Sequence, residues 1–541
     1  MPGPGLPDPA FASHDLDERT ILAYEEGHDA DISSNIGFIP EKHSSSTENV
    51  HELTDLEKGP HTSSSSITAA DAPASPPDPN IVWWDSDQDP ANPMNWSMKL
   101  KWGNIAVLSI ITLITPLASS MFAPGVPQVM KDFKSSNQQL ATFVVSVYVL
   151  GFAFGPLVIA PLSELYGRLR IYHGCNLLFV IFTVACAVSS NLNMLIGFRF
   201  LGGCVGVAPL TIGGGTIADV MPQEKRGGAM AIWALGPLLG PVLGPVAGGY
   251  LCQAKGWRWV FYLLAIMAGA VSIAAVFLMR ETYAPTILAR KTARLRKETG
   301  NQDLRSKLDN GMLPKTLFLH SIVRPTKMLL FSPIVAALSV YMAVVYSILY
   351  LLFTTFTFVF EDTYHFSSGN VGLTYVASGV GMLLGLGVLG AVSDRIMKAK
   401  SKNGGMKPEY RLPPLVPGGL CIPVGLFMYG WSAQYHVHWI VPMIGTLFVG
   451  LGLIAVFMCI QTYLVDAFTV HAASAMAANT VLRSIFGALL PLAGLRMYAV
   501  LGLGWGNSLV GFVALALLPI PFLLLKYGES IRTNPRFQVK L

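Results

Sequence analysis

The sequence predicts an all-α membrane protein with twelve transmembrane helices in two pseudo-symmetric six-helix bundles. The first observation is composition: of 541 residues, 52% are hydrophobic and only 13% are charged, whereas soluble domains carry about 25% charged residues. The second is that the apolar residues form twelve long runs. The third is a weak internal repeat, in which acidic residues stand at matched places in the two halves. Six scattered Cys indicate neither a disulfide framework nor a metal site.

Residues 1–98 differ from the rest of the chain, because Pro, Ser, Asp, Glu and His dominate them and no apolar run occurs. This composition predicts a disordered N-terminal tail, and no cleavable signal peptide is visible. Near its end, Trp83, Trp84 and Trp96 suit an anchor at the membrane interface.

The apolar runs predict the spans, since each is long enough to cross about 30 Å of hydrocarbon. We expect them at about 102–123, 140–161, 173–190, 194–216, 229–251, 258–279, 333–359, 371–392, 415–433, 439–463, 474–496 and 506–525. The N-terminal bundle then covers 99–283 and the C-terminal bundle 332–527. A short tail, 528–541, ends the chain.

The orientation follows from Lys and Arg, which gather in the loops after spans two, four and eight and in the central loop, 284–331. Because basic loops stay on the inner side of a membrane, both termini are expected in the cytosol. Part of the central loop, 287–308, interleaves basic and apolar residues. It is expected to form a helix on the inner membrane surface, or else a solvated linker.

One stretch inside span five, 236–249, carries three Gly-Pro pairs spaced four residues apart. On a helix, that spacing keeps the glycines close to one face, where a second helix can approach at backbone distance. Interior prolines remove backbone hydrogen bonds, which a membrane helix tolerates when its neighbours satisfy the released groups. The stretch is either a packing face or a pivot between two moving halves.

The acidic residues of the internal repeat are Glu164, Asp219, Asp394 and Asp466. Each stands at the expected cytosolic end of the second or fourth helix of its half. Two repeated six-helix halves with a pathway between them are typical of secondary transporters.

At these residues the chain resembles the major facilitator superfamily, and more narrowly the fungal twelve-span drug:proton antiporters that confer resistance to drugs or export polyamines. The stretches that carry the resemblance are 89–97, 161–168, 199–203, 281–285, 408–413 and 479–484. The resemblance implies proton-driven export by alternating access, with no cofactor besides the proton gradient.

The antiporter motif of that family is matched by Gly240, Gly244, Pro245, Gly248 and Gly249. Its earlier glycine is replaced by Ala231, and span one lacks the usual acid. The resemblance also implies a charge network that closes the cytosolic side, although exposed loop charges are the plainer alternative. The residues of this predicted gate are Glu164, Gly167, Arg168, Asp219, Asp394, Arg395 and Asp466.

Two arginines lie well inside predicted spans, away from the span ends: Arg199 in span four and Arg483 in span eleven. A buried Arg costs about 2.5–3.5 kcal/mol on insertion scales, so it normally faces the interior with a partner. The resemblance implies that Arg199 supports proton coupling, and we expect it in a water-accessible cavity. The alternatives are a structural Arg bonded to backbone carbonyls for Arg199 and a snorkelling or interface cation for Arg483.

Polar-tipped and aromatic side chains in several spans suit a mostly apolar pocket with a few hydrogen-bonding groups. Packing or lipid contact is the alternative for each of them. The candidate pocket residues are Tyr148, Trp233, Tyr346, Tyr350, Phe353, Tyr375, Gln461 and Asn479.

These observations favour a proton-coupled exporter of small amphipathic compounds such as drugs, toxins or secondary metabolites. We expect it in a fungal plasma membrane, with the vacuolar membrane as an alternative, and as a monomer whose partners are its substrate and lipid rather than nucleic acid. A transporter of one native metabolite, such as an organic anion, is the second hypothesis, because the spans offer Arg199 and Arg483 but no acid. A membrane enzyme or receptor is the third, although no catalytic constellation, Walker motif or metal-ligand spacing is visible.

Overall fold

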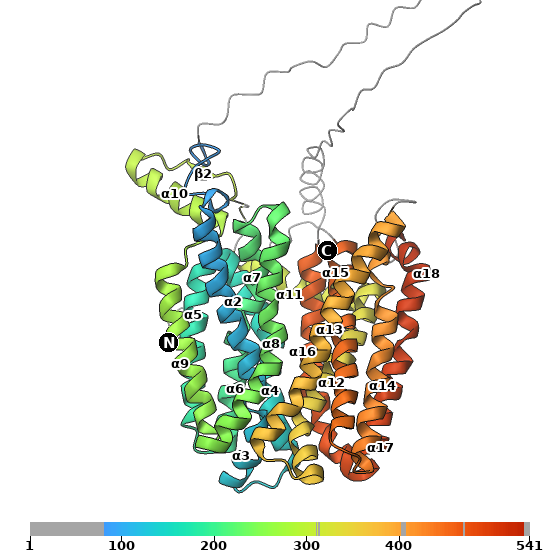
Figure 1. Ribbon diagram of the computed structural model, residues 1–541. Coiled ribbons are helices and arrows are strands. Elements are labelled where there is room, and N and C mark those ends of the chain that lie inside the picture. Colours follow the sequence, from blue (N-terminus) through green and yellow to red (C-terminus); the bar gives the residue numbers. More distant parts are fainter. Residues whose placement is uncertain (1–79, 310, 312–313, 402–406, 469–470, 535–541) are drawn as a thin grey trace, which may run out of the picture. The chain divides into compact units, whose positions relative to one another are not determined.

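The computed structural model describes residues 80–534 except 310, 312–313, 402–406 and 469–470, and it consists almost wholly of long helices that run side by side (Figure 1). Most of the predicted N-terminal tail, 1–79, and the last seven residues lie outside this description. The helices of the first half are α2 (Met98–Ser120), α3 (Val126–Asp132), α4 (Gln138–Tyr166), α5 (Arg168–Ala187), α6 (Leu192–Gly206), α7 (Ala208–Val220), α8 (Gln223–Lys255) and α9 (Arg258–Leu278).

The central loop contains two further helices, and the second half follows it. The bounds are α10 (Ala284–Thr299), α11 (Pro314–Phe331), α12 (Pro333–Tyr364), α13 (Ser368–Ser401), α14 (Leu415–Gln434), α15 (Ile440–Ala467), α16 (Ala472–Leu489), α17 (Gly494–Leu517) and α18 (Pro519–Thr533). Two short strands, β1 (Ile81–Val82) and β2 (Arg305–Ser306), form a parallel pair. Short 3₁₀ turns lie at Pro93–Asn95, Ala123–Gly125, Pro408–Arg411 and Leu490–Ala493.

In the described part of the chain, eleven helical stretches are long and apolar enough to cross a membrane, and the last of them has 62 residues. That stretch reverses at Gly502, whose φ of 75° is non-helical. Across the reversal, the Tyr498 hydroxyl donates to Asn507 Oδ1 at 2.9 Å. The last stretch therefore holds two of the predicted spans, and all twelve lie in helices.

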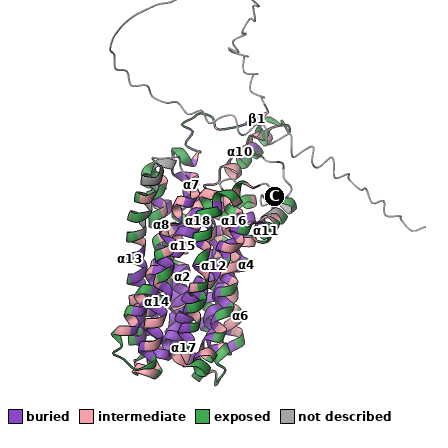
Figure 2. Ribbon diagram, turned by 90° about the vertical axis from the view of Figure 1, so that its right-hand side faces the viewer, coloured by how far each residue is buried: buried purple, intermediate pink, exposed green. Residues whose placement is uncertain are grey.

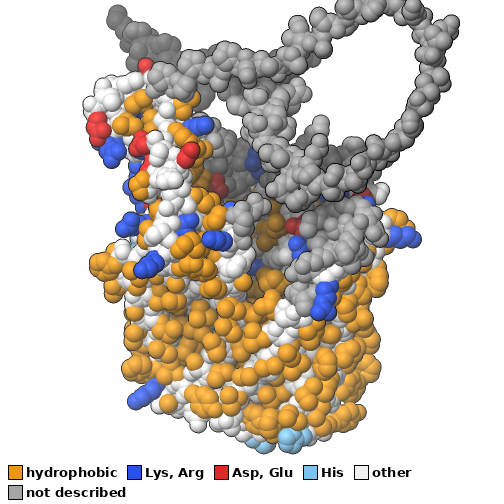
Figure 3. Space-filling model, turned by 45° about the horizontal axis from the view of Figure 1, so that its top comes forward, with side chains coloured by type: hydrophobic (Ala, Val, Ile, Leu, Met, Phe, Trp, Pro, Cys, Tyr) orange, Lys and Arg blue, Asp and Glu red, His pale blue; other side chains and the backbone are white. Residues whose placement is uncertain are grey.

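The exterior of the helices suits a lipid environment, as the composition indicates. Buried residues concentrate along the middle of the helices (Figure 2), while large apolar side chains such as Phe277 and Val500 are 81% and 75% exposed. Hydrophobic side chains cover most of the flank visible in Figure 3, and most Lys and Arg side chains lie above them. Exposed apolar surface of this extent is typical of a protein that lies in a bilayer.

Residues 80–97, predicted as the end of a disordered tail, take a defined conformation against the central loop. Ile81 pairs with Arg305 in the β1–β2 ladder, and Lys291 Nζ donates to Asp85 Oδ1 at 2.6 Å. Hydrogen bonds from the backbone N–H of Asp85 and Ala91 hold the pKa of Asp89 below its ordinary value. We call residues 80–97 with α10 and β2 the clasp. The prediction was wrong for this segment because its hydrogen-bond and ion-pair partners lie about 200 positions later in the chain. The composition of the segment itself does not reveal such distant partners.

Candidate functional site

One face of α8 packs against α2 of the same half at backbone distance. Gly236, Gly240, Gly244 and Gly248, spaced four residues apart, all point at α2. A Cβ at Gly236 would lie 2.9 Å from the backbone nitrogen of Leu113, and one at Gly240 only 2.8 Å from Pro116. No larger residue fits without moving α2, because real side chains do not approach this closely.

A second face of α8 packs against α13, which belongs to the other half. Gly249 lies against the carbonyl of Ser368, and Gly372 lies against the backbone of Pro245. The backbone N–H of Gly369 donates to Gln253 Oε1 at 3.2 Å. The antiporter motif therefore divides between two seams: Gly240, Gly244 and Gly248 face α2, whereas Pro245 and Gly249 face the other half.

Three hydrogen bonds also join the two halves. Ser146 Oγ donates to the Ala488 carbonyl at 2.7 Å, and Thr357 Oγ1 donates to the Ala123 carbonyl at 3.3 Å. Ser119 Oγ and the Tyr350 hydroxyl lie 2.8 Å apart. The residues of all three bonds lie nearer to the predicted outer ends of their helices than to the predicted cytosolic ends, where α10 lies. The halves are thus held together at the predicted outer side.

Arg199 lies in α6 and is only 2% exposed. Its Nη2 donates to the carbonyls of Ser119 and Val145, each at 3.3 Å. The guanidinium also lies over the rings of Phe122 at 4.9 Å and Tyr148 at 5.3 Å. Arg199 therefore has the geometry of the structural alternative, in which backbone carbonyls and aromatic rings satisfy the charge.

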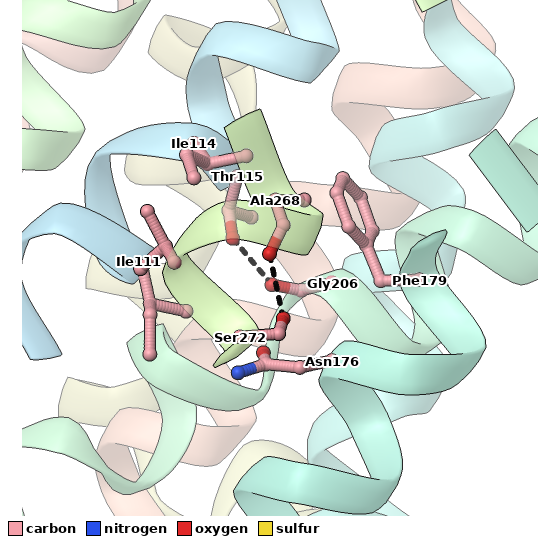
Figure 4. A pocket seen from close by; sticks show the side chains of 9 residues that line it. Ile111, Ile114, Thr115, Asn176, Phe179, Gly206, Ala268 and Ser272 are labelled. Atoms are coloured by element: carbon pink, nitrogen blue, oxygen red, sulfur yellow. Dashed lines mark hydrogen bonds between the residues drawn. The ribbon is translucent and has the colours of Figure 1, made fainter. Parts of the chain in front are cut away.

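Two small cavities lie inside the first half, each of about 10 Å³, which is the space for about one water molecule. One adjoins Arg199, Tyr148 and Thr183. Figure 4 shows the other, where Thr115 Oγ1 donates to the Gly206 carbonyl at 2.5 Å and Asn176 Nδ2 has no described partner. Neither is large enough for an organic substrate, and the one that adjoins Arg199 has space for about one water molecule beside it.

Arg483 in α16 contrasts with Arg199, because no hydrogen bond or ion pair joins its guanidinium to any described residue. Its Nε and Nη1 are buried without a partner, and the guanidinium lies over the rings of Tyr346 at 5.0 Å and Phe457 at 5.1 Å. One turn earlier in α16, the fully buried amide of Asn479 has neither a donor nor an acceptor partner among the described residues. Arg483 and Asn479 are thus polar groups available to a ligand or water.

The predicted pocket residues separate into three groups rather than one pocket. Tyr148 lies at Arg199, and Trp233 Nε1 donates to Thr112 Oγ1 at 3.0 Å in the α8–α2 seam. A third group is an aromatic row along α12 and α13, with neighbouring ring centroids 5.1 to 5.9 Å apart: Tyr346, Tyr350, Phe353 and Tyr375. Arg483 joins this third group through Tyr346, and it also lies over Phe457, which stands one turn before Gln461 in α15. Asn479 and Gln461, whose buried Oε1 has no described partner, are therefore counted with the third group.

At the predicted cytosolic end of the first half, the gate residues Arg168 and Asp219 form an ion pair at 2.5 Å. Thr282 Oγ1 also donates to Asp219, at 3.2 Å. Glu281 accepts the backbone N–H of Arg168 at 3.0 Å, so its carboxylate caps the N-terminus of α5. A Cβ at Gly167, whose φ is 91°, would collide with this carboxylate.

The second half has its own pairs at the corresponding place. Asp466 pairs with Arg411 at 3.0 Å, and Arg532 pairs with Glu409 at 3.4 Å. Of the other predicted gate residues, Glu164 and Arg395 are exposed and form no ion pair with a described residue. The side chain of Asp394 lies outside the described residues.

The sequence reasoning missed Glu281 and Arg532 as gate candidates, as well as the partners Glu409 and Arg411. Glu281 follows the sixth span and Arg532 ends the twelfth, so an alignment of one half with the other would have revealed them. The ion pairs of each gate lie within one half. In this conformation the described gate residues stabilise each bundle rather than bridge the two.

The comparisons with known proteins agree with this architecture. Residues 108–491 match the family model of the Major Facilitator Superfamily. The chain is 62% identical over 463 residues to the MFS-type transporter penM of Penicillium rubens, covering 85% of this chain and 91% of that protein. It is 60% identical over 467 residues to the efflux pump radE of Floropilus chiversii, covering 86% and 87%. Among solved structures, a D-xylose–proton symporter is similar with a TM-score of 0.60 at 15% identity, covering 81% of this chain and 99% of that one.

Proposed function

Because the chain belongs to the major facilitator superfamily, we propose that it is a proton-coupled secondary transporter that exports small amphipathic organic compounds by alternating access. The family and the relatives named above are transporters rather than enzymes. One relative at 60% identity is named an efflux pump, which favours export over uptake. The chain is a multi-pass membrane protein of a fungal type, and its substrate is a small molecule.

The observation that carries the mechanism is the double seam of α8. Its glycines fix it to α2 in its own half, while Pro245 and Gly249 meet α13 in the other half. Because α8 is held firmly against α2 of its own half and also contacts α13 of the other half, it is a suitable pivot for movement of one half against the other. In alternating access, the α8–α13 contacts and the Ser119–Tyr350 hydrogen bond would separate when the outer side opens.

The arrangement described here corresponds to the outer-closed, inward-facing form of that cycle. The glycine contacts of α8 with α13 and the three hydrogen bonds join the halves at their predicted outer ends, which supports this assignment. In the outward-open form, the predicted gate residues at the cytosolic ends would close the opposite side.

Coupling to protons needs a group that titrates, and arginine does not deprotonate in proteins. No Asp or Glu stands inside the twelve predicted spans. We therefore assign proton uptake to the carboxylates at the cytosolic ends, among which Asp219 and Asp466 each pair with an arginine. Arg199 and Arg483 act as fixed charges. No cofactor other than the proton gradient is required.

The cellular setting is part of the proposal. The asymmetry of Lys and Arg favours a cytosolic location for both termini, and export of toxic compounds from the cell favours the plasma membrane. A monomer is sufficient, because both halves of the pathway lie in one chain.

The test is efflux from proteoliposomes that contain the full chain, measured with and without an imposed proton gradient against a panel of amphipathic compounds. Gradient-dependent transport of several panel members is expected. Gly249→Val should abolish it by disrupting the α8–α13 seam. The matched control is Gly269→Val in α9, where a Cβ would meet nothing within 4 Å. Transport that ignores the proton gradient, or a Gly249→Val variant as active as the control, would refute the mechanism.

A further inference from the structure

The unpartnered guanidinium of Arg483 is the starting point. A buried donor without a hydrogen-bond partner is costly, and a buried charge without one is more so. Native proteins rarely keep such a group unless water, an ion or a ligand completes it. Arg483 lies about 16 Å along α16 from its first residue, Ala472, so it is far from either headgroup region. It is therefore placed to meet something that enters between the helices.

Two amides lie beside Arg483. Asn479 stands one helical turn before it, on the same face of α16. Arg483 packs over Phe457 of α15, and α15 and α16 are successive helices that run in opposite directions. Gln461 stands one turn after Phe457 in α15, and Asn479 stands one turn before Arg483 in α16. Because the two helices run in opposite directions, both steps go the same way along the bundle and bring Gln461 to the height of Asn479. The buried atoms of both amides that lack partners, Asn479 Nδ2 and Oδ1 and Gln461 Oε1, then lie one turn from the guanidinium.

Aromatic rings flank this cluster toward the boundary between the halves. Tyr346 lies against the guanidinium at 5.0 Å, and its ring is 5.1 Å from that of Tyr350. Tyr350 in turn meets Ser119 of the first half through the 2.8 Å hydrogen bond. A molecule that binds at Arg483 is thus one aromatic contact away from the hydrogen bond that joins the two halves.

We propose that Arg483, Asn479 and Gln461 form a recognition site for the acidic group of a planar organic acid, such as a carboxylic acid, an acidic phenol or an enol. The planar fork of Arg483 binds the anion, because its geometry matches a carboxylate. Asn479 and Gln461 bind the neighbouring carbonyl or hydroxyl, and Tyr346 stacks on the planar body. This proposal rests on the proposed function, since it names the class of compound that the transporter carries.

The chemistry of the surroundings favours an anion over a cation. The predicted spans contain no carboxylate that would attract a cationic drug. Arg199, the other buried charge, is already bonded to two carbonyls and does not compete for the anion.

The experiment compares two probes of the same shape, 1-naphthoate and 1-naphthamide, which differ in charge. Binding of each to the full chain in lipid nanodiscs is measured by titration calorimetry at neutral pH. A charge-assisted hydrogen bond predicts that the wild type binds the acid about tenfold or more tightly than the amide. Arg483→Gln should reduce that ratio to about one, and Arg483→Lys should give an intermediate ratio because the fork is lost.

A matched control is Arg496→Gln, the same change at an exposed arginine in the following helix α17, which should keep the wild-type ratio. A second variant guards against a misfolded Arg483→Gln protein. Asn479→Asp places a carboxylate one turn from Arg483 and should weaken naphthoate binding at least about tenfold, with naphthamide changed less than about twofold. Equal affinity of the wild type for the two probes, binding of neither probe, or a preference that survives both variants would overturn the site.

Transport is measured separately, so that the two proposals can fail independently. If naphthoate binding depends on Arg483 but no compound moves in response to a proton gradient, the proposed coupling fails and the site stands. If the panel compounds are exported with protons while the acid preference is absent, the site fails and the transporter stands.

Discussion

Each half of the molecule holds one arginine in the middle of its helices, Arg199 fully buried and Arg483 partly buried, and their surroundings differ. Arg199 of the first half donates to two carbonyls and lies over aromatic rings. Arg483 of the second half lies over two rings but donates to no described residue. The same residue type is therefore part of the scaffold in one half and available for binding in the other. The first half is the more completely satisfied structure, and the second holds the groups that a substrate can complete.

The cytosolic ends of the two halves repeat this pattern of similar placement with different chemistry. In the first half, an acid that follows the sixth span, Glu281, caps the backbone of α5. In the second half, a base at the end of the twelfth span, Arg532, pairs with Glu409 before α14. The two charged side chains thus stand at corresponding places, but one binds backbone N–H groups and the other binds a carboxylate.

The largest expected difference between the halves is in stability. Arg199→Leu should lower the free energy of unfolding by about 3 kcal/mol or more, because two buried carbonyls lose their donor. Arg483→Met should leave it unchanged or raise it by about 1–4 kcal/mol, because an unpaired buried charge is removed. Thermal unfolding in nanodiscs measures both. If Arg483→Met destabilised the protein as much as Arg199→Leu, the two arginines would be equivalent after all.

The seam between the halves is the next test. Gly372→Val in α13 would place a side chain against the Pro245 backbone, and overpacking costs about 1–3 kcal/mol. Because the proposed cycle breaks the seam when the outer side opens, that cost should shift the population toward the outward-open form by about fivefold or more. Reaction of a Cys probe at Ser119 with an external thiol reagent should accelerate accordingly. Gly387→Val, on the same helix but in open space, should react at the wild-type rate; an equal effect would locate the cause outside the seam.

The ion pairs at the cytosolic ends should differ in strength according to their burial. The side chains of Arg168 and Asp219 are 13% and 19% exposed, whereas those of Arg411 and Asp466 are 25% and 36% exposed. A double-mutant cycle on unfolding should give a coupling of about 1–2 kcal/mol for the first pair and less than about 1 kcal/mol for the second. The reverse order would show that the second half has the stronger gate.

The smallest effect is expected at the clasp. Lys291→Ala removes the ion pair with Asp85, whose side chain is 81% exposed, and the longer pair with Asp89, at 3.8 Å, so the free energy of unfolding should change by about 1 kcal/mol. Because the pKa of Asp89 is lowered in the folded protein, its contribution is present at neutral pH and is lost as the pH falls below about 4. Limited proteolysis near Trp83 measures the opening. Wild type should be cleaved faster at acidic pH than at pH 7, and Asp89→Asn should be cleaved at the faster rate at both. If both proteins were cleaved equally slowly at both pH values, this role for Asp89 would be excluded.

The sequence by itself determined the membrane class, the twelve spans, the division into two halves and the glycine spacing of α8. These properties are local: hydrophobic run length, basic loops and a repeat of four residues depend only on neighbours along the chain. They also sufficed to recognise the family, and the comparisons confirm it. Of the residues in the predicted gate, Arg168 and Asp219 form an ion pair with each other, whereas Asp466 pairs with Arg411, which the prediction did not include; their role as a gate stays a prediction.

Only the tertiary structure decided which group each buried polar side chain meets. The partners of Arg199 come from α2 and α4, the second seam of α8 comes from α13, and the clasp joins residues about 220 positions apart. The rotation of each helix about its axis and its height against its neighbours set these contacts, and neither is encoded in a local pattern. For this reason the predicted pocket separated into three groups. The two arginines, alike in sequence as single charges in apolar spans, became a scaffold residue and a binding residue because their helices present them to different neighbours.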